Sequence, residues 1–338
     1  MMTTLPVIDL SRFDGTEQER SETLYALAQA AATNGFFYIR NHGIPEQLTR
    51  EVLEAANRFF DLDASAKDQV HIRHSAHFRG YSIMKNERDW REQIHVGQEL
   101  PVSSIQYPAS SIQHPAYHQL TGPNLWPEAL GDHFKNPVLE FMQAANKVGN
   151  RLLEAFATLL GLPQSHFNDI SQEPPYLLLK LICYYAQPLH DIDRPGVAPH
   201  CDWSWLTILL QDSAGLEVLA PEGVWVSAPP QPSMLSVNIG ELLEIVSKGR
   251  FVATAHQVVN PSEQKRRISV PVFINPALDA RIESVQNKDI QNPLDEQFHV
   301  HRVLPRGVYP AVVHFGESEW QRKGLGQWCF DTQCIQAK

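Results

Sequence analysis

The stretch His200-Cys201-Asp202, followed by the β-prone run Leu206-Thr207-Ile208-Leu209-Leu210, decides how this chain folds and what it can bind. On a strand, residues i and i+2 lie on the same face, so the imidazole of His200 and the carboxylate of Asp202 can meet one ion. The motif alone is weak evidence, because roughly 0.7 His-x-Asp pairs are expected by chance in a chain of this composition. A metal site is therefore predicted only if the sequence around the motif also supports one.

Short β-prone runs separated by turn residues lie around this motif. They fall at 177–185, 205–211, 216–219, 224–226, 234–239, 251–259, 267–274 and 311–315. Strands at such spacing predict a sandwich or barrel rather than βαβ units. His256 lies in one of these runs, and a third ligand from a distant strand would close a metal site in a β-barrel. Two histidines and one carboxylate leave three positions of an iron ion open for substrate and O₂.

The first half of the chain has a different pattern. Apolar residues at helical spacing predict helices at 17–33, 45–60 and 137–160, and short apolar runs predict strands at 5–10 and 36–40. Residues 63–135 contain no long periodic run and predict irregular structure with short pieces of regular structure. We therefore expect a helical first half packed around an all-β second half, with no linker between independent domains.

Composition excludes several classes of function. The 338-residue chain has a net charge of −10 and no basic cluster beyond Lys265-Arg266-Arg267, which argues against nucleic-acid binding. There is no signal-peptide pattern at the N-terminus and no run of 18 apolar residues, so no membrane association is expected. Four scattered cysteines predict reduced thiols rather than a disulfide framework. We expect a soluble, cytoplasmic monomer.

The order and spacing of these motifs resemble the isopenicillin N synthase-like group of 2-oxoglutarate/Fe(II)-dependent dioxygenases. Residues 177–276 resemble its catalytic core, and three early motifs resemble its N-terminal region: Pro6-Val7-Ile8-Asp9, Gly35-Phe36-Phe37 and Asn41-His42-Gly43-Ile44. The resemblance implies an α+β fold, a double-stranded β-helix (jelly-roll) core flanked by helices mostly from the N-terminal half. It implies a single catalytic unit over 1–338, with an N-terminal region at 1–135 and a long helix plus jelly roll at 136–338.

The resemblance also implies roles for particular residues. The family's metal ligands fall on His200, Asp202 and His256, and its Arg-x-Ser, which binds the distal carboxylate of 2-oxoglutarate, falls on Arg267 and Ser269. A guanidinium pairs bidentately with a carboxylate, and a hydroxyl two residues on lies on the same strand face. Neighbouring Arg266 should face the other way and be solvated.

A family tyrosine at the cosubstrate pocket aligns with Tyr185. The preceding Asn of the usual Asn-x-Tyr is replaced by Cys183, which puts the side-chain amide contact to the cosubstrate in doubt. For the substrate, we expect an aromatic, moderately polar cavity that contacts Tyr81, Ile94, Trp203 and Phe273.

The implied activity is the oxidation of a small organic metabolite with Fe(II), 2-oxoglutarate and O₂, releasing succinate and CO₂. Hydroxylation, desaturation and cyclisation all remain open. Three alternatives are an Fe(II) oxidase of the same family that uses no 2-oxoglutarate, a non-enzymatic ligand-binding barrel, and a zinc hydrolase. Intact metal and Arg-x-Ser motifs weigh against the barrel, and the lack of a general-base Glu at metal-motif spacing weighs against the hydrolase.

Overall fold

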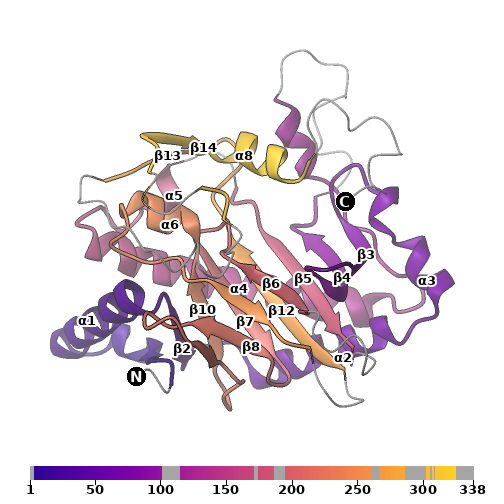
Figure 1. The fold of residues 1–338 in the computed structure, drawn as a ribbon, viewed down its shortest axis with the longest axis horizontal. Helices are drawn as coiled ribbons and strands as arrows, with labels where there is room; N and C mark the ends of the chain where they lie inside the picture. The colour runs from indigo at the N-terminus through magenta and orange to yellow at the C-terminus, as the bar shows by residue number, and fades with distance from the viewer. Residues whose placement is uncertain are drawn as a thin grey trace.

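The computed structural model describes residues 4–100, 115–170, 174–185, 195–260, 266–285, 302–304, 307 and 309–324. Its centre is an eight-stranded sheet in the order β1-β2-β10-β7-β12-β5-β4-β3 (Figure 1). These strands are β1 (Val7–Asp9), β2 (Phe36–Arg40), β3 (Gly80–Lys85), β4 (Trp90–Gly97), β5 (Leu178–Tyr184), β7 (Leu206–Gln211), β10 (Leu235–Ile239) and β12 (Arg267–Ile274). All neighbouring pairs are antiparallel except β1 with β2.

A second sheet has four strands in the order β6-β11-β8-β9, formed by β6 (Val197–His200), β11 (His256–Val258), β8 (Leu216–Leu219) and β9 (Trp225–Ser227). One buried cluster joins the two sheets, because it contains Phe36 of β2, Ile182 of β5, Val218 of β8 and Val258 of β11. The inner faces of the two sheets therefore pack together, as in a jelly roll. A separate two-stranded sheet pairs β13 (Arg281–Glu283) with β14 (Val312–His314).

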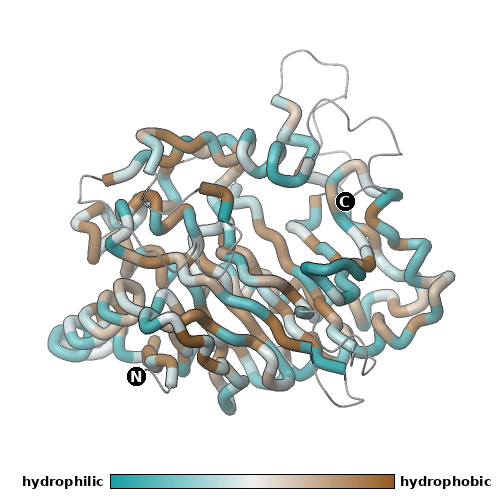
Figure 2. Tube along the Cα trace, in the orientation of Figure 1, coloured by the Kyte–Doolittle hydropathy of each residue, from teal (hydrophilic) through white to brown (hydrophobic). Residues whose placement is uncertain are grey.

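Helices pack around the sheets, and two of the long ones lie on the outer face of the large sheet. The long ones are α1 (Glu17–Thr33), α2 (Glu46–Phe60) and α4 (Asp132–Leu159), and the short ones are α3 (Ala64–Gln69), α5 (His166–Asp169), α6 (Glu241–Val246) and α8 (Phe315–Arg322). The main core cluster combines apolar residues of α2 and α4, such as Phe59 and Phe141, with the outward-facing residues of the sheet, such as Ile94 and Val270. Figure 2 shows hydrophobic residues concentrated along the central strands.

The sheet positions the site by alternation along its strands. On β5, Leu179 and Leu181 face the helices, while Lys180, Ile182 and Tyr184 face the second sheet and line the cavity between the sheets. This pattern decides which residues can reach a ligand.

The expected fold class is confirmed, but the division into a helical half and an all-β half is wrong. Strands β1 to β4, all from the first 100 residues, belong to the large sheet. Residues 63–135, expected to be irregular, contain α3, β3 and β4. The signal was missed because β4 buries the polar residues Arg91, Gln93 and His95 on its inner face, which removes the usual apolar alternation.

Several element bounds also differ from the expectation. Helix α4 begins at Asp132, so Pro137 lies inside it. The run 251–259 forms a strand only at His256–Val258. Within the described residues, no helix is long and apolar enough to cross a membrane.

Candidate metal centre

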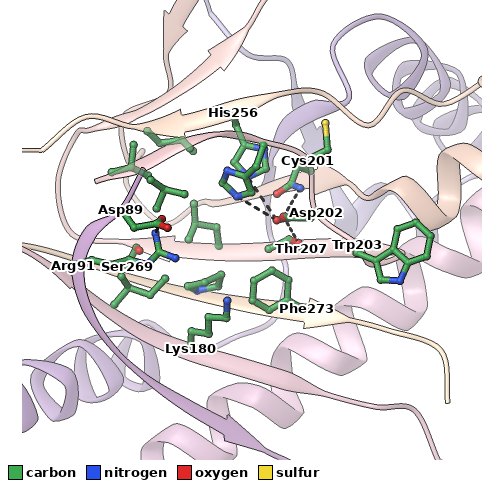
Figure 3. Close-up of a pocket in the computed structure, with 18 of the residues that line it drawn as sticks. Asp89, Arg91, Lys180, Cys201, Asp202, Trp203, Thr207, His256, Ser269 and Phe273 are labelled. Carbon is green, nitrogen blue, oxygen red and sulfur yellow. Dashed lines mark hydrogen bonds and ion pairs between the residues drawn. The ribbon is translucent and has the colours of Figure 1, made fainter. Parts of the chain in front are cut away.

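His200, Asp202 and His256 come together between the two sheets (Figure 3). His200 ends β6 and His256 begins β11, and the two residues are directly opposite each other in the antiparallel pair. Asp202 lies just beyond β6, with its Oδ1 atom 3.6 Å from His200 Nε2 and 3.7 Å from His256 Nε2. The three potential ligand atoms lie within 4.8 Å of one another, and within the described part of the chain this is the one such His/Cys/Asp/Glu group.

Hydrogen bonds orient both imidazoles. His200 Nδ1 lies 2.9 Å from the carbonyl oxygen of Ala198, and His256 Nδ1 lies 3.2 Å from that of Thr254. A carbonyl only accepts, so each Nδ1 carries the proton and donates it, which leaves the Nε2 lone pair facing Asp202. This is the tautomer that a metal-binding histidine needs.

The carboxylate of Asp202 is held equally firmly. Its Oδ2 atom accepts hydrogen bonds from Thr207 Oγ1 at 2.6 Å and from Asn238 Nδ2 at 2.8 Å. Oδ1 is thereby left toward the histidines. Thr207 on β7 and Asn238 on β10 are themselves paired in the sheet, so the backbone fixes both donors.

Electrostatics keep Asp202 and His200 in their ligand forms. Burial acts to raise the pKa of Asp202, but His256, His200 and the two hydrogen bonds outweigh it and lower the pKa, so the carboxylate is ionised. Burial and the neighbouring His256 lower the pKa of His200, so that imidazole is neutral. One carboxylate and two imidazoles on one side of an ion are the donor set of non-haem Fe(II) oxygenases. The residues therefore fit the expected metal.

Arg267 and Ser269 lie on β12, on the strand face that lines the same cavity. Arg267 is buried, with Nε donating to the Ser213 carbonyl at 3.1 Å and Nη2 donating to Gln211 Oε1 at 2.7 Å. Its Nη1 atom is buried and has no hydrogen-bond partner among the described residues. A buried guanidinium with one free donor, next to a hydroxyl on the same face, fits a carboxylate ligand such as the distal end of 2-oxoglutarate.

The structure places Tyr184, rather than Tyr185, in the cavity. Tyr184 is directly opposite Arg267 in the β5–β12 pair, and its ring lies under the guanidinium at 5.0 Å. Tyr185 follows the end of β5, packs against the main core and is not among the cavity-lining residues. Cys183 is fully buried in that core. The residue that replaces the family's usual Asn therefore faces away from the cavity.

Arg266 faces the opposite side of β12 from Arg267, as expected, but it is only partly solvated, with 23% of its side chain exposed. Its Nη1 atom forms an ion pair with Asp61 Oδ1 at 2.7 Å, and its Nε donates to Asn57 Oδ1 at 2.9 Å. The side chain ties β12 to α2, and its pKa is raised mainly by the hydrogen bond to Asp61.

The four expected substrate contacts divide into two groups. Trp203 and Phe273 line the cavity, which has a volume of about 370 Å³. Tyr81 and Ile94 lie in the main core on the helix side of the sheet and do not line it. They are apolar residues of strands whose inner face is polar, so they pack against the helices. From that edge of the sheet, Asp89 and Arg91 line the cavity instead.

Sequence reasoning missed several cavity residues, namely Lys180, Thr207, Asn238 and Glu319. Lys180 was detectable in principle, because it is a charged residue inside an apolar strand. Other potential ligands do not assemble: His71 Nδ1 accepts from the backbone N–H of Arg73, and His77 Nδ1 lies 2.8 Å from the Gln119 carbonyl. His299, His301, Cys329 and Cys334 lie outside the described residues.

Comparison with known proteins covers most of the chain. Residues 5–129 match the family described as "non-haem dioxygenase in morphine synthesis N-terminal", and residues 178–276 match the 2OG-Fe(II) oxygenase superfamily. The chain is 30% identical over 308 residues to the 2-oxoglutarate-dependent dioxygenase traH of Penicillium crustosum, covering 86% of this chain and 87% of that protein.

Solved structures are similar over the same extent. A full-length protein of Neurospora crassa, solved in complex with alpha-KG and 5-formyluracil, is 25% identical with a TM-score of 0.74, over 94% of this chain and 95% of that chain. A 2OG-Fe(II) oxygenase family protein of Caulobacter crescentus is also 25% identical with a TM-score of 0.74, over 96% and 99% of the two chains.

Proposed function

Because the chain belongs to the 2OG-Fe(II) oxygenase superfamily, we propose that His200, Asp202 and His256 bind the Fe(II) ion with which it oxidises a small organic molecule. The protein is a non-haem Fe(II)/2-oxoglutarate-dependent dioxygenase. The residue assignment rests on one observation: three oriented ligand atoms lie close together on one side of the cavity.

Bound Fe(II) supplies O₂ activation coupled to the conversion of 2-oxoglutarate to succinate and CO₂. The chain's own residues hold and orient the reactants. Thr207 and Asn238 fix the Asp202 carboxylate, and the Ala198 and Thr254 carbonyls fix the two imidazoles. Second-sphere contacts of this kind set ligand geometry and metal affinity.

Arg267 and Ser269 are proposed to bind the distal carboxylate of 2-oxoglutarate, with Tyr184 in the place expected for Tyr185. The unpartnered Nη1 of Arg267 supports this role, because a buried donor without a partner costs free energy until a ligand pairs with it. The curated relatives that match this chain include several named 2-oxoglutarate-dependent dioxygenases, so the oxidase that needs no cosubstrate is not favoured.

Trp203 and Phe273 are proposed to contact the substrate. Phe273 is directly opposite Thr207 in the β7–β12 pair, so its ring lies next to the group that holds Asp202. Trp203 is among the cavity-lining residues and also packs in the main core, and it donates from Nε1 to Ser318 Oγ at 3.2 Å. Aromatic walls with a few polar groups suit a small, partly apolar organic molecule.

Other sequence-based expectations stay proposals. They are that residues 1–338 form one catalytic unit, that the protein acts in the cytoplasm as a monomer, that it binds no nucleic acid, and that it belongs to the isopenicillin N synthase-like group. The buried free thiol of Cys183 agrees with a reducing compartment.

The metal assignment is tested with His200→Ala, Asp202→Ala and His256→Ala, each loaded anaerobically with Fe(II). We expect each variant to fold, to lose most of its iron affinity and to release no succinate, because water cannot replace a ligand with the same geometry. His133→Ala is the matched control, since His133 is exposed on α4 and far from the cluster in sequence. Wild-type iron content and succinate release in any of the three variants would exclude that residue as a ligand.

A further inference from the structure

One charged side chain of the cavity remains without a counterion. Lys180 on β5 lines the cavity, and among the described residues it has no ion pair and no hydrogen bond. Its closest aromatic contact is with the ring of Phe273, whose centre lies 5.1 Å from Nζ. Figure 3 shows Lys180 beside Phe273, across the cavity from Asp202 and His256.

The other charges of the cavity already have partners. Arg91 forms an ion pair with Asp89, and Arg322 Nε lies 3.0 Å from Glu319 Oε2. Asp202 is matched to the proposed Fe(II), and Arg267 to the distal carboxylate of 2-oxoglutarate. Arg88 also lines the cavity, but it is exposed to solvent. Once the metal and the cosubstrate are bound, Lys180 is therefore the partly buried cation left unmatched among the described cavity residues.

The position next to Lys180 also lacks hydrogen bonds. His95 is directly opposite Lys180 in the β4–β5 pair, and both of its ring nitrogens are buried without a partner among the described residues. Burial lowers the pKa of His95 well below the usual range, so it is neutral and supplies no counterion. Lys180 lines the cavity and His95 does not, so a polar ligand in the cavity would give Lys180 the partner that His95 does not supply.

Electrostatics agree with this interpretation. Burial, together with the nearby Arg91, Lys323 and Arg322, lowers the pKa of Lys180 to about 7, while Asp202 acts weakly in the opposite direction. An anion bound at Nζ would offset the effect of burial. It would raise the pKa of Lys180 and keep the side chain charged.

Lys180 is close to the metal centre but far from the cosubstrate clamp. Asp202 contacts Thr207, Thr207 is paired with Phe273, and Phe273 lies under Lys180, so a ligand held by Lys180 reaches the metal along the Phe273 ring. Along β5, Lys180 lies four residues from Tyr184, the partner of Arg267. Four residues of extended strand span about 13 Å, which separates Lys180 from the proposed position of the distal carboxylate of 2-oxoglutarate.

We propose that the prime substrate carries a carboxylate, and that Lys180 binds this carboxylate while Phe273 contacts the apolar body of the substrate. This inference rests on the proposed function, because it assigns the substrate class of the same cavity. A single lysine matches a single negative charge, whereas a phosphate ester would require further donors that the other paired cations cannot offer. A monocarboxylic acid with an aliphatic or aromatic body fits both the charge and the ring.

The test is calorimetric binding to the anaerobic protein loaded with Fe(II) and 2-oxoglutarate. The probes are two acids, 3-phenylpropionate and hexanoate, and their primary amides, which have nearly the same shape and no charge. We expect the wild type to bind at least one acid about tenfold or more tightly than its amide, because a charge-assisted hydrogen bond forms only with the acid. Lys180→Met should bring the acid-to-amide ratio close to one, whereas Lys180→Arg should retain the preference.

Lys85→Met is the matched control, because Lys85 also lies over an aromatic ring, that of Trp90 at 5.6 Å, but is exposed outside the cavity. If Lys180→Met does not fold, Lys180→Gln takes its place. Equal binding of acids and amides by the wild type, including no binding of either, overturns the proposal. So does an acid preference that persists in the Lys180 variants, or an acid that competes with 2-oxoglutarate. The binding measurement needs no turnover. Failure of this proposal, seen as no preference for the acid, is therefore distinguishable from failure of the proposed function, seen as absent succinate release.

Discussion

Replacing Arg267 by lysine tests the proposed cosubstrate clamp. The structure holds two of the guanidinium nitrogens on protein oxygens, at Ser213 and Gln211, and leaves Nη1 free in the cavity. The guanidinium of Arg267 is therefore already oriented before a ligand binds. A lysine ammonium keeps the charge but cannot contact both protein oxygens and a carboxylate in this geometry.

The expected magnitude follows from the contact that is lost. A hydrogen bond between charged partners contributes about 2 kcal/mol. Arg267→Lys should therefore weaken 2-oxoglutarate binding by about 30-fold, since each 1.4 kcal/mol is about tenfold in affinity. Binding of Fe(II) should stay within about twofold of the wild type, because Arg267 does not contact the metal ligands.

The assay is the 2-oxoglutarate dissociation constant of the anaerobic Fe(II) protein, with the KM from succinate release as a second readout. Arg266→Lys is the matched control, because Arg266 is the adjacent residue on the opposite strand face and pairs with Asp61. It should lower stability slightly and leave 2-oxoglutarate binding unchanged. Two results would exclude Arg267 as the residue that binds 2-oxoglutarate. One is wild-type 2-oxoglutarate binding by both variants, and the other is a change in only the prime-substrate KM of Arg267→Lys.

Three further predictions concern the metal, the substrate wall and the cavity lysine. Thr207→Val removes the 2.6 Å hydrogen bond to Asp202 Oδ2 and should weaken Fe(II) binding by roughly tenfold. Thr207→Ser keeps a hydroxyl and should retain the affinity. Equal Fe(II) affinities of the two variants in a metal titration would rule out this supporting role. Trp203→Ala should leave substrate-independent decarboxylation of 2-oxoglutarate intact and reduce coupled product formation, and loss of both activities together in parallel assays would point to a purely structural tryptophan. For Lys180, the folded pKa of about 7 lies below the unfolded value of about 10.4, so the unfolded state binds more protons between these values and stability should rise with pH from about 7 to 10. In urea denaturation of the metal-free protein, Lys180→Met should be more stable than the wild type at pH 7, and the difference should shrink toward pH 10; a difference independent of pH would contradict the shifted pKa.

Part of the site could be predicted from the sequence because it depends on local alternation. His200 and Asp202 are two residues apart, as are Arg267 and Ser269, and the structure places both pairs in one cavity. His256 required a long-range contact, which motif order supplied through family resemblance and which the β6–β11 register explains.

The remaining site residues depend on strand register, which a sequence does not fix by itself. Tyr184 and Tyr185 are adjacent aromatic residues, and a shift of one residue exchanges their faces. Ile94 was expected in the substrate pocket because residues 79–98 were expected to cover the substrate, but the cavity face of β4 is polar and its apolar face packs on the helices. Lys180 was overlooked for the same reason, since its role depends on which face of β5 is inward.

The most direct test of the central claim is to measure O₂ consumption and succinate release together. The protein is loaded anaerobically with Fe(II) and 2-oxoglutarate and then exposed to O₂, with Asp202→Ala treated identically. The account predicts equal molar amounts of O₂ consumed and succinate formed by the wild type, and neither above background in Asp202→Ala. Consumption of O₂ without succinate, or equal succinate release by the two proteins, would contradict a 2-oxoglutarate-dependent iron site at His200, Asp202 and His256.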